Sequence, residues 1–487
     1  MSLVLQDSSL LQDKAFINGA WVNADSGAAL AVSNPASGNI IAQVACCSGA
    51  ETRRAIEAAN TALPAWRAQP AKQRASLLRN LFELMMDNQE DLARILTAEQ
   101  GKPLAEARGE IAYSASFIEW FAEEAKRQYG DTIPAPGTDK RIVVIKQGIG
   151  VVACITPWNF PSAMLGRKIG PALAAGCTVV CKPASATPLS AYAIGVLAER
   201  AGIPAGVINI VSGNAGDIGD ELTANPIVRK LTFTGSTPVG KQLMARCAST
   251  VKRTSMELGG NAPFIVFNDA DLDAAVAGAI ASKYRNAGQT CVCANRLLVQ
   301  AEVYDAFTTK LAAAVTQFKL GDGSEDGINM GPLIDQRAAN DVMGFIKDAV
   351  ERGAHIVTGG GPAAIGGSFI EPTILTNVSA EMRVFREEIF GPVAPLFKFD
   401  TEKEAIAMAN DTEFGLAAYF YSRDIGRVWR VSEGLEYGIV GVNEGIISTE
   451  VAPFGGVKES GIGREGSYYG MDDYTEIKYL CMGGIDQ

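Results

Sequence analysis

The segment Gly288–Cys291, which reads Gly-Gln-Thr-Cys, offers the most reactive side chain in the sequence, and a second cysteine, Cys293, stands two residues farther on. A cysteine thiolate is a strong nucleophile, so this segment indicates thiol chemistry. Such a thiol commonly takes a histidine as its base, but the only histidine, His355, lies in an ordinary run of sequence. We therefore expect a carboxylate to act as the base.

Composition indicates a globular protein large enough for two or three domains. The chain has 487 residues, of which 47% are hydrophobic and 20% are charged. Its net charge of −11 would repel a nucleic acid or an anionic membrane, so neither is an expected partner. No run of about 18 apolar residues is present, and Met1–Leu11 lacks the basic start of an export signal, which favours a cytoplasmic location.

The nine cysteines favour free thiols over structural crosslinks or metal binding. Their number is odd and their positions are scattered, which disfavours a disulfide framework. Two close pairs, Cys177 with Cys181 and Cys291 with Cys293, lack the second pair or the histidines that complete a zinc site. We expect no bound metal.

Hydrophobic periodicity divides the chain into a helical opening and two strand–helix alternations. Apolar residues recur at helical spacing from Ala50 to Glu124. Strands then alternate with helices, which implies right-handed parallel crossovers and a doubly wound α/β sheet. The predicted strands cover 141–146, 150–155, 178–181, 207–211 and 231–234, and the predicted helices cover 168–175, 189–201 and 215–222. A second alternation runs from a strand at 263–267 to about Tyr437, so we expect a domain boundary near Gly259.

The carboxyl ends of the first set of strands form the expected ligand edge. Doubly wound sheets bind ligands beyond those ends, which here carry Trp158, Asn159, Lys182, Gly235 and Ser236. The segment Phe233–Lys241 resembles a phosphate loop, but Gln242 stands where such a loop needs a serine or threonine to hold magnesium. ATP hydrolysis is therefore disfavoured. A turn that binds a pyrophosphate through its backbone N–H groups remains, beside the interpretation as a plain strand–helix turn.

Four segments carry a resemblance to a known family. They are Pro157–Pro161 (Pro-Trp-Asn-Phe-Pro), Met256–Asn261 (Met-Glu-Leu-Gly-Gly-Asn), Gly288–Cys291 and Glu388–Pro392 (Glu-Ile-Phe-Gly-Pro). Their order and spacing resemble the aldehyde dehydrogenase superfamily over nearly the whole chain. The resemblance implies an α/β fold with a Rossmann-type cofactor domain (1–126 and 147–258), a second α/β catalytic domain (259–445), and a small β oligomerisation arm with the C-terminal segment (127–146 and 446–487).

The resemblance also implies how an aldehyde would be oxidised to an acid. Cys291 would attack the aldehyde carbon, while the Asn159 side-chain amide and the Cys291 backbone N–H stabilise the oxyanion. Hydride transfer to a nicotinamide would leave a thioester, and Glu257 would draw a proton from water so that hydroxide releases the acid. Each residue also has an ordinary structural interpretation: a turn before Pro161, a strand end and a buried small side chain.

Cofactor preference is expected to depend on the end of the strand at 178–181. Relatives that prefer NAD commonly carry an acidic residue where this chain has Ser185, because a carboxylate repels a ribose phosphate. Ser185 together with Lys182 therefore favours NADP, with NAD as the weaker alternative. By the same resemblance, the cofactor also contacts Thr156, Pro157, Trp158, Gly235, Ser236, Glu388 and Phe390.

Substrate choice is expected to depend on cations near the thiol. The runs Lys283–Cys293, Ser162–Lys168 and Gly445–Ser448 resemble those of succinate-semialdehyde dehydrogenases. In those enzymes, residues matching Arg167, Arg285 and Ser448 bind the carboxylate at the far end of the substrate. The sequence departs from commoner relatives at Leu165–Gly166 and at Glu444, so glutarate semialdehyde, which is one methylene longer, stays an alternative.

The resemblance extends to redox behaviour and assembly. Cys293 is a candidate redox partner of Cys291, against the interpretation of a second thiol without a role. The hairpin-like 127–146 segment and the C-terminal 468–480 segment imply a homo-oligomer, either a dimer or a tetramer. A noncatalytic dinucleotide-binding protein of the same fold is the alternative from another functional class, and the retained Cys291, Glu257 and Asn159 speak against it.

Overall fold

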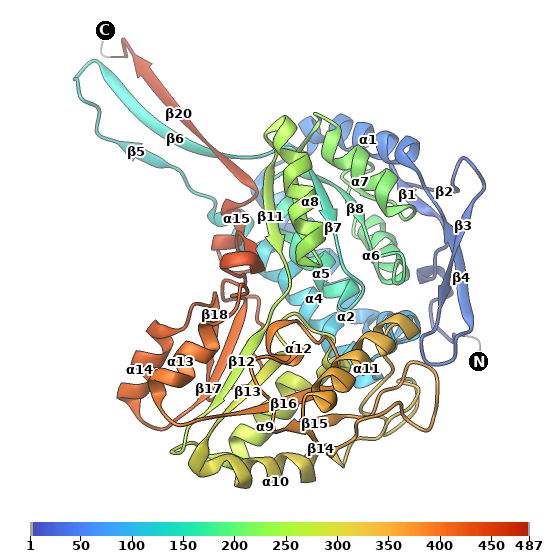
Figure 1. The fold of residues 1–487 in the computed structure, drawn as a ribbon. Coiled ribbons are helices and arrows are strands. Elements are labelled where there is room, and N and C mark those ends of the chain that lie inside the picture. The colour runs from blue at the N-terminus through green and yellow to red at the C-terminus, as the bar shows by residue number, and fades with distance from the viewer. Residues whose placement is uncertain (1–2, 486–487) are drawn as a thin grey trace.

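In the computed structural model, which describes residues 3–485, the first sheet has eight strands in the order β19-β11-β10-β7-β8-β9-β1-β2 (Figure 1). Its five central strands are parallel, and helices cover both faces. These strands are β7 (Val151–Ile155), β8 (Thr178–Lys182), β9 (Ile208–Ile210), β10 (Val228–Thr234) and β11 (Arg253–Glu257), and the helices between them are α5 (Pro161–Ala174), α6 (Leu189–Arg200), α7 (Ala215–Ala224) and α8 (Thr237–Cys247). The predicted doubly wound arrangement is confirmed, because apolar runs such as β7 are buried throughout.

The edges of this sheet are strands that the sequence analysis did not predict. A hairpin of β1 (Ala15–Ile17) and β2 (Ala20–Val22) covers one edge, and β19 (Gly461–Ile462) pairs antiparallel with β11 at the other. A separate hairpin joins β3 (Ala29–Ser33) to β4 (Ile40–Ala45). Strands of two or three residues are too short to show a period-two pattern, which is why they were missed.

Four long helices follow strands β1 to β4, as the helical spacing from Ala50 to Glu124 predicted. They are α1 (Gly49–Ala68), α2 (Ala71–Asp87), α3 (Gln89–Gln100) and α4 (Leu104–Glu124). A capping box begins α1, since the Ser48 hydroxyl accepts the Ala50 N–H at 3.2 Å and the Glu51 carboxylate accepts the Ser48 N–H at 2.9 Å. Helix α4 packs against α5, which brings polar side chains of α4 to the carboxyl edge of the first sheet.

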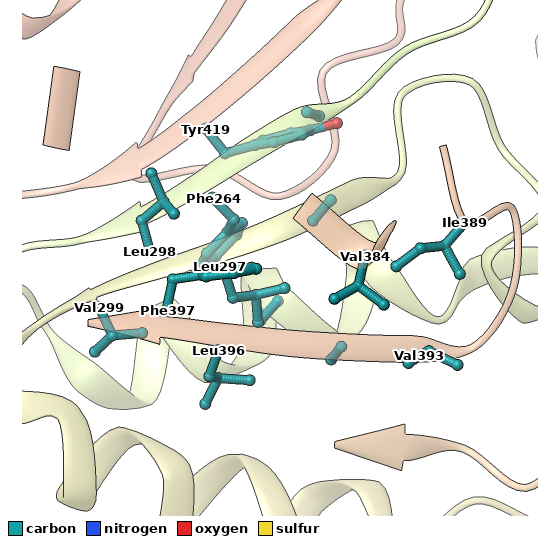
Figure 2. Packing of buried hydrophobic residues seen from close by; sticks show 14 of the residues in the cluster. Phe264, Leu297, Leu298, Val299, Val384, Ile389, Val393, Leu396, Phe397 and Tyr419 are labelled. Atoms are coloured by element: carbon teal, nitrogen blue, oxygen red, sulfur yellow. The ribbon is translucent and has the colours of Figure 1, made fainter. Parts of the chain in front are cut away.

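The second sheet has seven strands in the order β14-β15-β16-β13-β12-β17-β18, and every pair except β14–β15 is parallel. Its strands are β12 (Ala262–Val266), β13 (Ala294–Gln300), β14 (His355–Thr358), β15 (Thr373–Thr376), β16 (Val393–Phe399), β17 (Ala417–Tyr421) and β18 (Ile439–Val442). Figure 2 shows part of its core, where Phe264, Leu297 and Phe397 from three neighbouring strands lie together. Burying each such side chain stabilises the fold by roughly 1.5–3 kcal/mol.

Helices cover this second sheet and continue the predicted alternation. They are α9 (Leu272–Lys283), α10 (Tyr304–Val315), α11 (Gln336–Glu351), α12 (Arg383–Arg386), α13 (Glu402–Asn410) and α14 (Ile425–Gly434). Asp271 caps α9, since its carboxylate accepts the Asp273 and Ala274 N–H groups. The short helices are η1 (Ser8–Leu10), η2 (Ala125–Arg127), η3 (Ala248–Thr250), η4 (Arg285–Gly288), η5 (Ala301–Val303), η6 (Lys458–Ser460) and α15 (Tyr469–Asp472).

A three-stranded antiparallel arm projects from the rest of the molecule (Figure 1). It consists of β5 (Asp131–Ile133), β6 (Lys140–Gly148) and β20 (Thr475–Gly483), so the two ends of the arm come from distant parts of the sequence. Ile477 is 71% exposed and Tyr479 is 60% exposed on its last strand. No helix between residues 3 and 485 is long and apolar enough to cross a membrane.

Candidate active site

Parallel register aligns the ends of four strands of the first sheet. Ile155 of β7 lies opposite Lys182 of β8, and Thr234 of β10 lies opposite Glu257 of β11. Strands β7 and β10 are themselves neighbours. The chain leaves all four strands at one edge, so the turn that carries Asn159 meets the ends of β8, β10 and β11 there, as the doubly wound pattern predicts.

The candidate nucleophile follows a loop with a strained backbone. Within η4, Asn286 (φ 51°, ψ 37°) and Ala287 (φ 52°, ψ 33°) both adopt the left-handed conformation. Each such non-glycine residue costs about 1 kcal/mol or more, which contacts around the loop must offset. Gly260 is required beside this loop, because a Cβ there would lie 2.5 Å from the carbonyl oxygen of Cys291.

The surroundings of Cys291 keep its sulfur protonated. Burial raises the pKa of the Cys291 thiol to about 12, and the positive charge of Arg167 opposes this rise. Glu388 and Glu257 raise the pKa further, whereas Arg285 lowers it. The thiol therefore has to give its proton to a base, or enter altered surroundings, before it can attack a carbonyl carbon.

Asn159 lies directly against the loop that carries Cys291, residues 286–291, which we call the cysteine loop. Its side chain is 5% exposed, and its Nδ2 donates a hydrogen bond to the carbonyl oxygen of Gln289 at 2.9 Å. An amide nitrogen carries two hydrogens, so one remains for an oxygen that develops charge next to Cys291. The structure thus brings together the predicted nucleophile and the predicted oxyanion donor, which are 132 residues apart in the sequence.

Glu257 is buried at the end of β11 without a hydrogen-bond partner. It is 3% exposed, and neither of its carboxylate oxygens has a partner within residues 3–485. Burial raises the pKa of Glu257 well above its ordinary value, and the negative charge of Glu465 raises it further, while Arg167 lowers it. A carboxylate with a raised pKa and free lone pairs is suited to accept a proton near neutral pH.

Sequence reasoning missed a second buried carboxylate, Glu465. Lys168 Nζ lies 2.5 Å from one of its oxygens and Arg167 Nε lies 2.8 Å from the other. Burial acts to raise the pKa of Glu465, but Lys168 and Arg167 outweigh burial and hold that pKa below its ordinary value. No sequence motif links positions 297 residues apart, so only the fold reveals this triad.

The three predicted substrate-binding residues all influence another residue that was missed, Tyr113 of α4. Its hydroxyl is buried and has no hydrogen-bond partner in the described part of the chain. Burial raises the pKa of Tyr113, and the charges of Arg167 and Arg285 and the Ser448 hydroxyl lower it, so all three lie within electrostatic range of the phenol. The Nη2 atom of Arg167 and the Nε atom of Arg285 also lack partners among residues 3–485.

Aromatic rings hold the two arginines. The guanidinium of Arg167 lies 3.9 Å from the ring centroid of Phe454, and that of Arg285 lies 5.4 Å from the ring centroid of Phe160. Cation–π contacts of this kind orient a guanidinium without using its N–H groups. Donors therefore remain for a negatively charged group of a ligand.

Trp158, Phe390 and Glu388 form a second group of predicted cofactor-binding residues. The Trp158 and Phe390 rings meet edge to face at 5.6 Å, and Phe390 has a left-handed backbone with φ 51°. Glu388 accepts the Gly260 N–H at 3.0 Å, and burial raises the pKa of Glu388 to about 7.

The remaining candidate cofactor residues lie along the strand ends. Burial lowers the pKa of Lys182 to about 8, and the Ser185 hydroxyl makes one long bond, 3.4 Å, to the Gly213 carbonyl oxygen. The Gly235 N–H donates to the Glu257 carbonyl oxygen at 3.0 Å, and Pro157 continues the turn after Thr156.

The segment that resembles a phosphate loop is the N-terminus of α8. Ser236 is its N-cap and makes no side-chain cap bond, so the first N–H groups of the helix remain free of a side-chain acceptor. Lys241 instead forms an ion pair with Glu459 at 2.7 Å on the surface. Buried hydroxyls of Thr156 and Thr234 lack partners within the described chain, and together with the uncapped helix they fit a dinucleotide at this edge.

Cys293, the predicted redox partner of Cys291, contacts Lys283. Its thiol is 7% exposed, and Lys283 Nζ donates to its sulfur at 3.4 Å. Burial raises the pKa of Cys293, and Lys283 opposes the rise. All nine cysteines are free.

Comparisons with known proteins show the family to which the chain belongs. The model of the aldehyde dehydrogenase family matches residues 21–480. The chain is 66% identical to a glutarate-semialdehyde dehydrogenase of Pseudomonas aeruginosa over 99% of this chain and 100% of that protein. It is 64% identical to an NADP⁺ succinate-semialdehyde dehydrogenase of Escherichia coli over 98% and 99% of the two chains. A crystal structure of an Escherichia coli NADP-dependent enzyme superposes with a TM-score of 0.98 at 63% identity, covering 99% and 100% of the two chains. The chain therefore belongs to the aldehyde dehydrogenase family and is an NAD(P)-dependent enzyme of that family.

Proposed function

We propose that this enzyme oxidises succinate semialdehyde to succinate and reduces NADP. The observation that carries the proposal is that Arg167 and Arg285 act on the half-buried Cys291 thiol while guanidinium nitrogens of both lack hydrogen-bond partners among residues 3–485; both arginines and Ser448 also act on the buried Tyr113 phenol. Such a cluster recognises an aldehyde that carries a negative charge at its far end. Glutarate semialdehyde is the second candidate, because one similar relative acts on it and one methylene is worth only about 1–3 kcal/mol in a pocket.

The reaction begins when Cys291 attacks the aldehyde carbon and forms a thiohemiacetal. The Asn159 amide and the Cys291 N–H donate to the oxyanion, a contribution that typically amounts to about 10²- to 10³-fold in rate. A nicotinamide held by the cofactor residues would supply the hydride acceptor, so that the adduct on Cys291 becomes a thioester. Glu257 then takes a proton from water, hydroxide attacks the thioester, and the carboxylic acid leaves as the thiol is restored.

The cofactor preference rests on Lys182 and Ser185. A cationic Nζ and a hydroxyl, with no carboxylate between them, suit a ribose phosphate better than a pair of ribose hydroxyls. Residues 1–126 and 147–258 would form the cofactor domain and 259–445 the catalytic domain. The cofactor would also contact Thr156, Pro157, Trp158, Gly235, Ser236, Glu388 and Phe390.

Two further features belong to this proposal. Exposed apolar side chains on the arm, such as Ile477 and Tyr479, support a homodimer or homotetramer, and the free cysteines support a cytoplasmic location. Cys293 would act as a redox partner of Cys291 only if its contact with Lys283 were broken, since that lysine already holds its sulfur. A noncatalytic dinucleotide-binding protein is disfavoured by the buried and unpartnered Glu257.

The decisive experiment compares short aldehydes with and without a terminal anion, each with NAD and with NADP. We expect succinate semialdehyde with NADP to have the highest kcat/KM, and NADP to exceed NAD by at least about tenfold, equal to 1.4 kcal/mol. Equal efficiency for butanal and succinate semialdehyde would refute the anion site. Equal efficiency for the two cofactors would refute only the preference for NADP.

Arg285→Ala provides the matching variant. Because Arg167 also compensates the charge of Glu465, removing Arg167 would disturb a buried ion pair, whereas Arg285 makes no ion pair in the described chain. Loss of a charged hydrogen bond worth about 1.5–3 kcal/mol should raise KM for succinate semialdehyde about 10- to 100-fold. The KM for butanal should stay the same, and an unchanged KM for succinate semialdehyde would contradict the assignment.

A further inference from the structure

A buried ion pair between Lys102, which lies between α3 and α4, and Glu110 of α4 contacts the turn that carries Asn159. Lys102 Nζ lies 2.5 Å from a Glu110 oxygen, and both side chains are fully excluded from solvent. The same Nζ donates to the carbonyl oxygen of Asn159 at 2.8 Å and lies 3.7 Å from the ring centroid of Phe160. The proposed chemistry does not use this pair, although a buried pair of charges costs several kcal/mol in lost hydration.

Glu110 holds the other end of the same turn. One of its oxygens accepts the N–H groups of Ser162 at 3.0 Å and Ala163 at 3.2 Å, at the start of α5. Helix α5 has no cap from its own N-cap side chain, so Glu110 supplies the negative charge that a helix N-terminus favours. Lys102 and Glu110 together therefore fix the backbone on both sides of Phe160.

Asn286, in the strained loop before Cys291, also contacts the Asn159 carbonyl oxygen. Its Nδ2 donates to the Asn159 carbonyl oxygen at 3.0 Å and to the Gln289 carbonyl oxygen at 3.3 Å. Gln100 donates to Asn286 Oδ1 at 2.9 Å, and Glu106 accepts the Asn286 N–H at 2.8 Å. These bonds hold Asn286 in its left-handed conformation and tie the loop to α3 and α4.

We propose that Lys102 and Asn286 are positioning residues that fix the Asn159 peptide, so that its side-chain amide meets the oxyanion formed on Cys291. A carbonyl oxygen has two lone pairs, and these two donors occupy both. With its carbonyl held from two sides, and its amide bonded to Gln289, Asn159 cannot shift relative to the nucleophile. This inference rests on the oxyanion role of Asn159 in the proposed function.

The test is a double-mutant cycle on the full-length enzyme, read from the pre-steady-state rate of reduced-nicotinamide formation with succinate semialdehyde. A displacement near 1 Å can cost about 10²-fold, so Lys102→Met should lower this rate about 10- to 100-fold and change KM less than about 3-fold. Asn286→Gly should act in the same direction, because glycine keeps the left-handed backbone and removes only the amide. In the Asn159→Ala background, each change should cost less than about 3-fold, since residues that act through one another are not additive.

Controls separate positioning from general destabilisation. Arg74 is buried and donates to the Ala174 carbonyl oxygen at the far end of α5, so Arg74→Met should lower thermal stability and leave the rate within about 3-fold of wild type. Lys102→Arg keeps a charged donor and should recover part of the lost rate. If Lys102→Met does not fold, Asn286→Gly alone tests the positioning role, because the Asn286 change leaves the Lys102–Glu110 pair intact.

The possible failures are distinct. Full multiplication of the losses in the Asn159→Ala background, or wild-type rates in both Lys102→Met and Asn286→Gly, would overturn the positioning role. A wild-type rate in Asn159→Ala alone would instead overturn the oxyanion assignment on which the inference rests.

Discussion

Two buried carboxylates that act on each other, Glu257 and Glu465, have pKa values shifted in opposite directions. Glu257 has no hydrogen-bond partner within the described residues, and burial and the charge of Glu465 raise its pKa. Glu465 forms ion pairs with Lys168 and Arg167, and these hold the pKa of Glu465 below its ordinary value. Pairs of titratable groups whose pKa values are driven apart in this way mark acid and base roles, so Glu257 is the group expected to take up a proton.

The pH dependence of turnover should report this coupling. Glu465→Gln removes a negative charge that raises the pKa of Glu257, so that pKa should fall. With a lower pKa, Glu257 keeps its basic form to lower pH, and the acid limb of the kcat profile should move to lower pH. The profile is measured with succinate semialdehyde between about pH 5 and pH 9.

Glu302→Gln is the matched control, since Glu302 is an exposed carboxylate on the second α/β unit and should leave the profile in place. A shift of the acid limb to higher pH in Glu465→Gln, or no shift, would show that Glu257 does not limit turnover through its basic form.

Side chains with chemistry in a short motif could be predicted from the sequence, and those held by distant contacts could not. Cys291, Glu257 and Asn159 stand in recognisable segments, and the fold brings them to one edge. Tyr113, Lys102 and Glu465 contact the site only through helix packing or through residues hundreds of positions away. Nothing in their local sequence marks them.

Secondary-structure elements also differ in how far the sequence predicts them. Buried parallel strands such as β7 and β8 are continuous apolar runs between turns, and their pattern is visible in the sequence. The short edge strands β1, β2 and β19 exist because neighbouring strands offer them unpaired backbone groups. That cause is tertiary, so local sequence carries almost no sign of them.

Helix α1 shows how one carboxylate can stabilise an element. Glu51 is 1% exposed and accepts the Asp25 N–H at 2.7 Å, the Ser48 N–H at 2.9 Å and the Ser48 hydroxyl at 2.6 Å. Burial acts to raise the pKa of Glu51, but these bonds outweigh burial and lower it to about 2. The ionised carboxylate thus joins the start of α1 to the loop between β2 and β3.

Glu51→Gln should lower the free energy of unfolding by about 1–2 kcal/mol near pH 7. Because the folded pKa lies below the ordinary value of 4.5, the ionised group stabilises the fold above that pH and loses this effect as the pH falls toward 2. The gap between wild type and variant should therefore narrow below about pH 4.5, as measured by denaturant titration at several pH values. A gap that stays constant or widens on acidification would contradict this account of the cap.

At the scale of the whole molecule, the arm is the part whose side chains are least covered by the rest of the described chain. Among the described residues, strands β5, β6 and β20 pair only with one another (Figure 1), and β20 is exposed after its first residue. Ile477 is 71% exposed and Tyr479 is 60% exposed, two residues apart on the same face of β20. A projecting sheet with exposed apolar side chains on a protein of net charge −11 is expected to be covered by another copy.

Combined Ile477→Asp and Tyr479→Asp should therefore convert the proposed oligomer into a monomer of about 51.3 kDa. Neither side chain belongs to a buried core of the described chain, so the far-ultraviolet circular dichroism of the variant should match wild type. The matched control carries Ala306→Asp and Thr309→Asp on the exposed surface of α10, at the other end of the molecule (Figure 1). Light scattering after size-exclusion chromatography gives the mass of each. An unchanged mass in the arm variant would show that the arm does not hold the assembly together, and a monomeric wild type would show that the exposed strand is tolerated in solution without a partner.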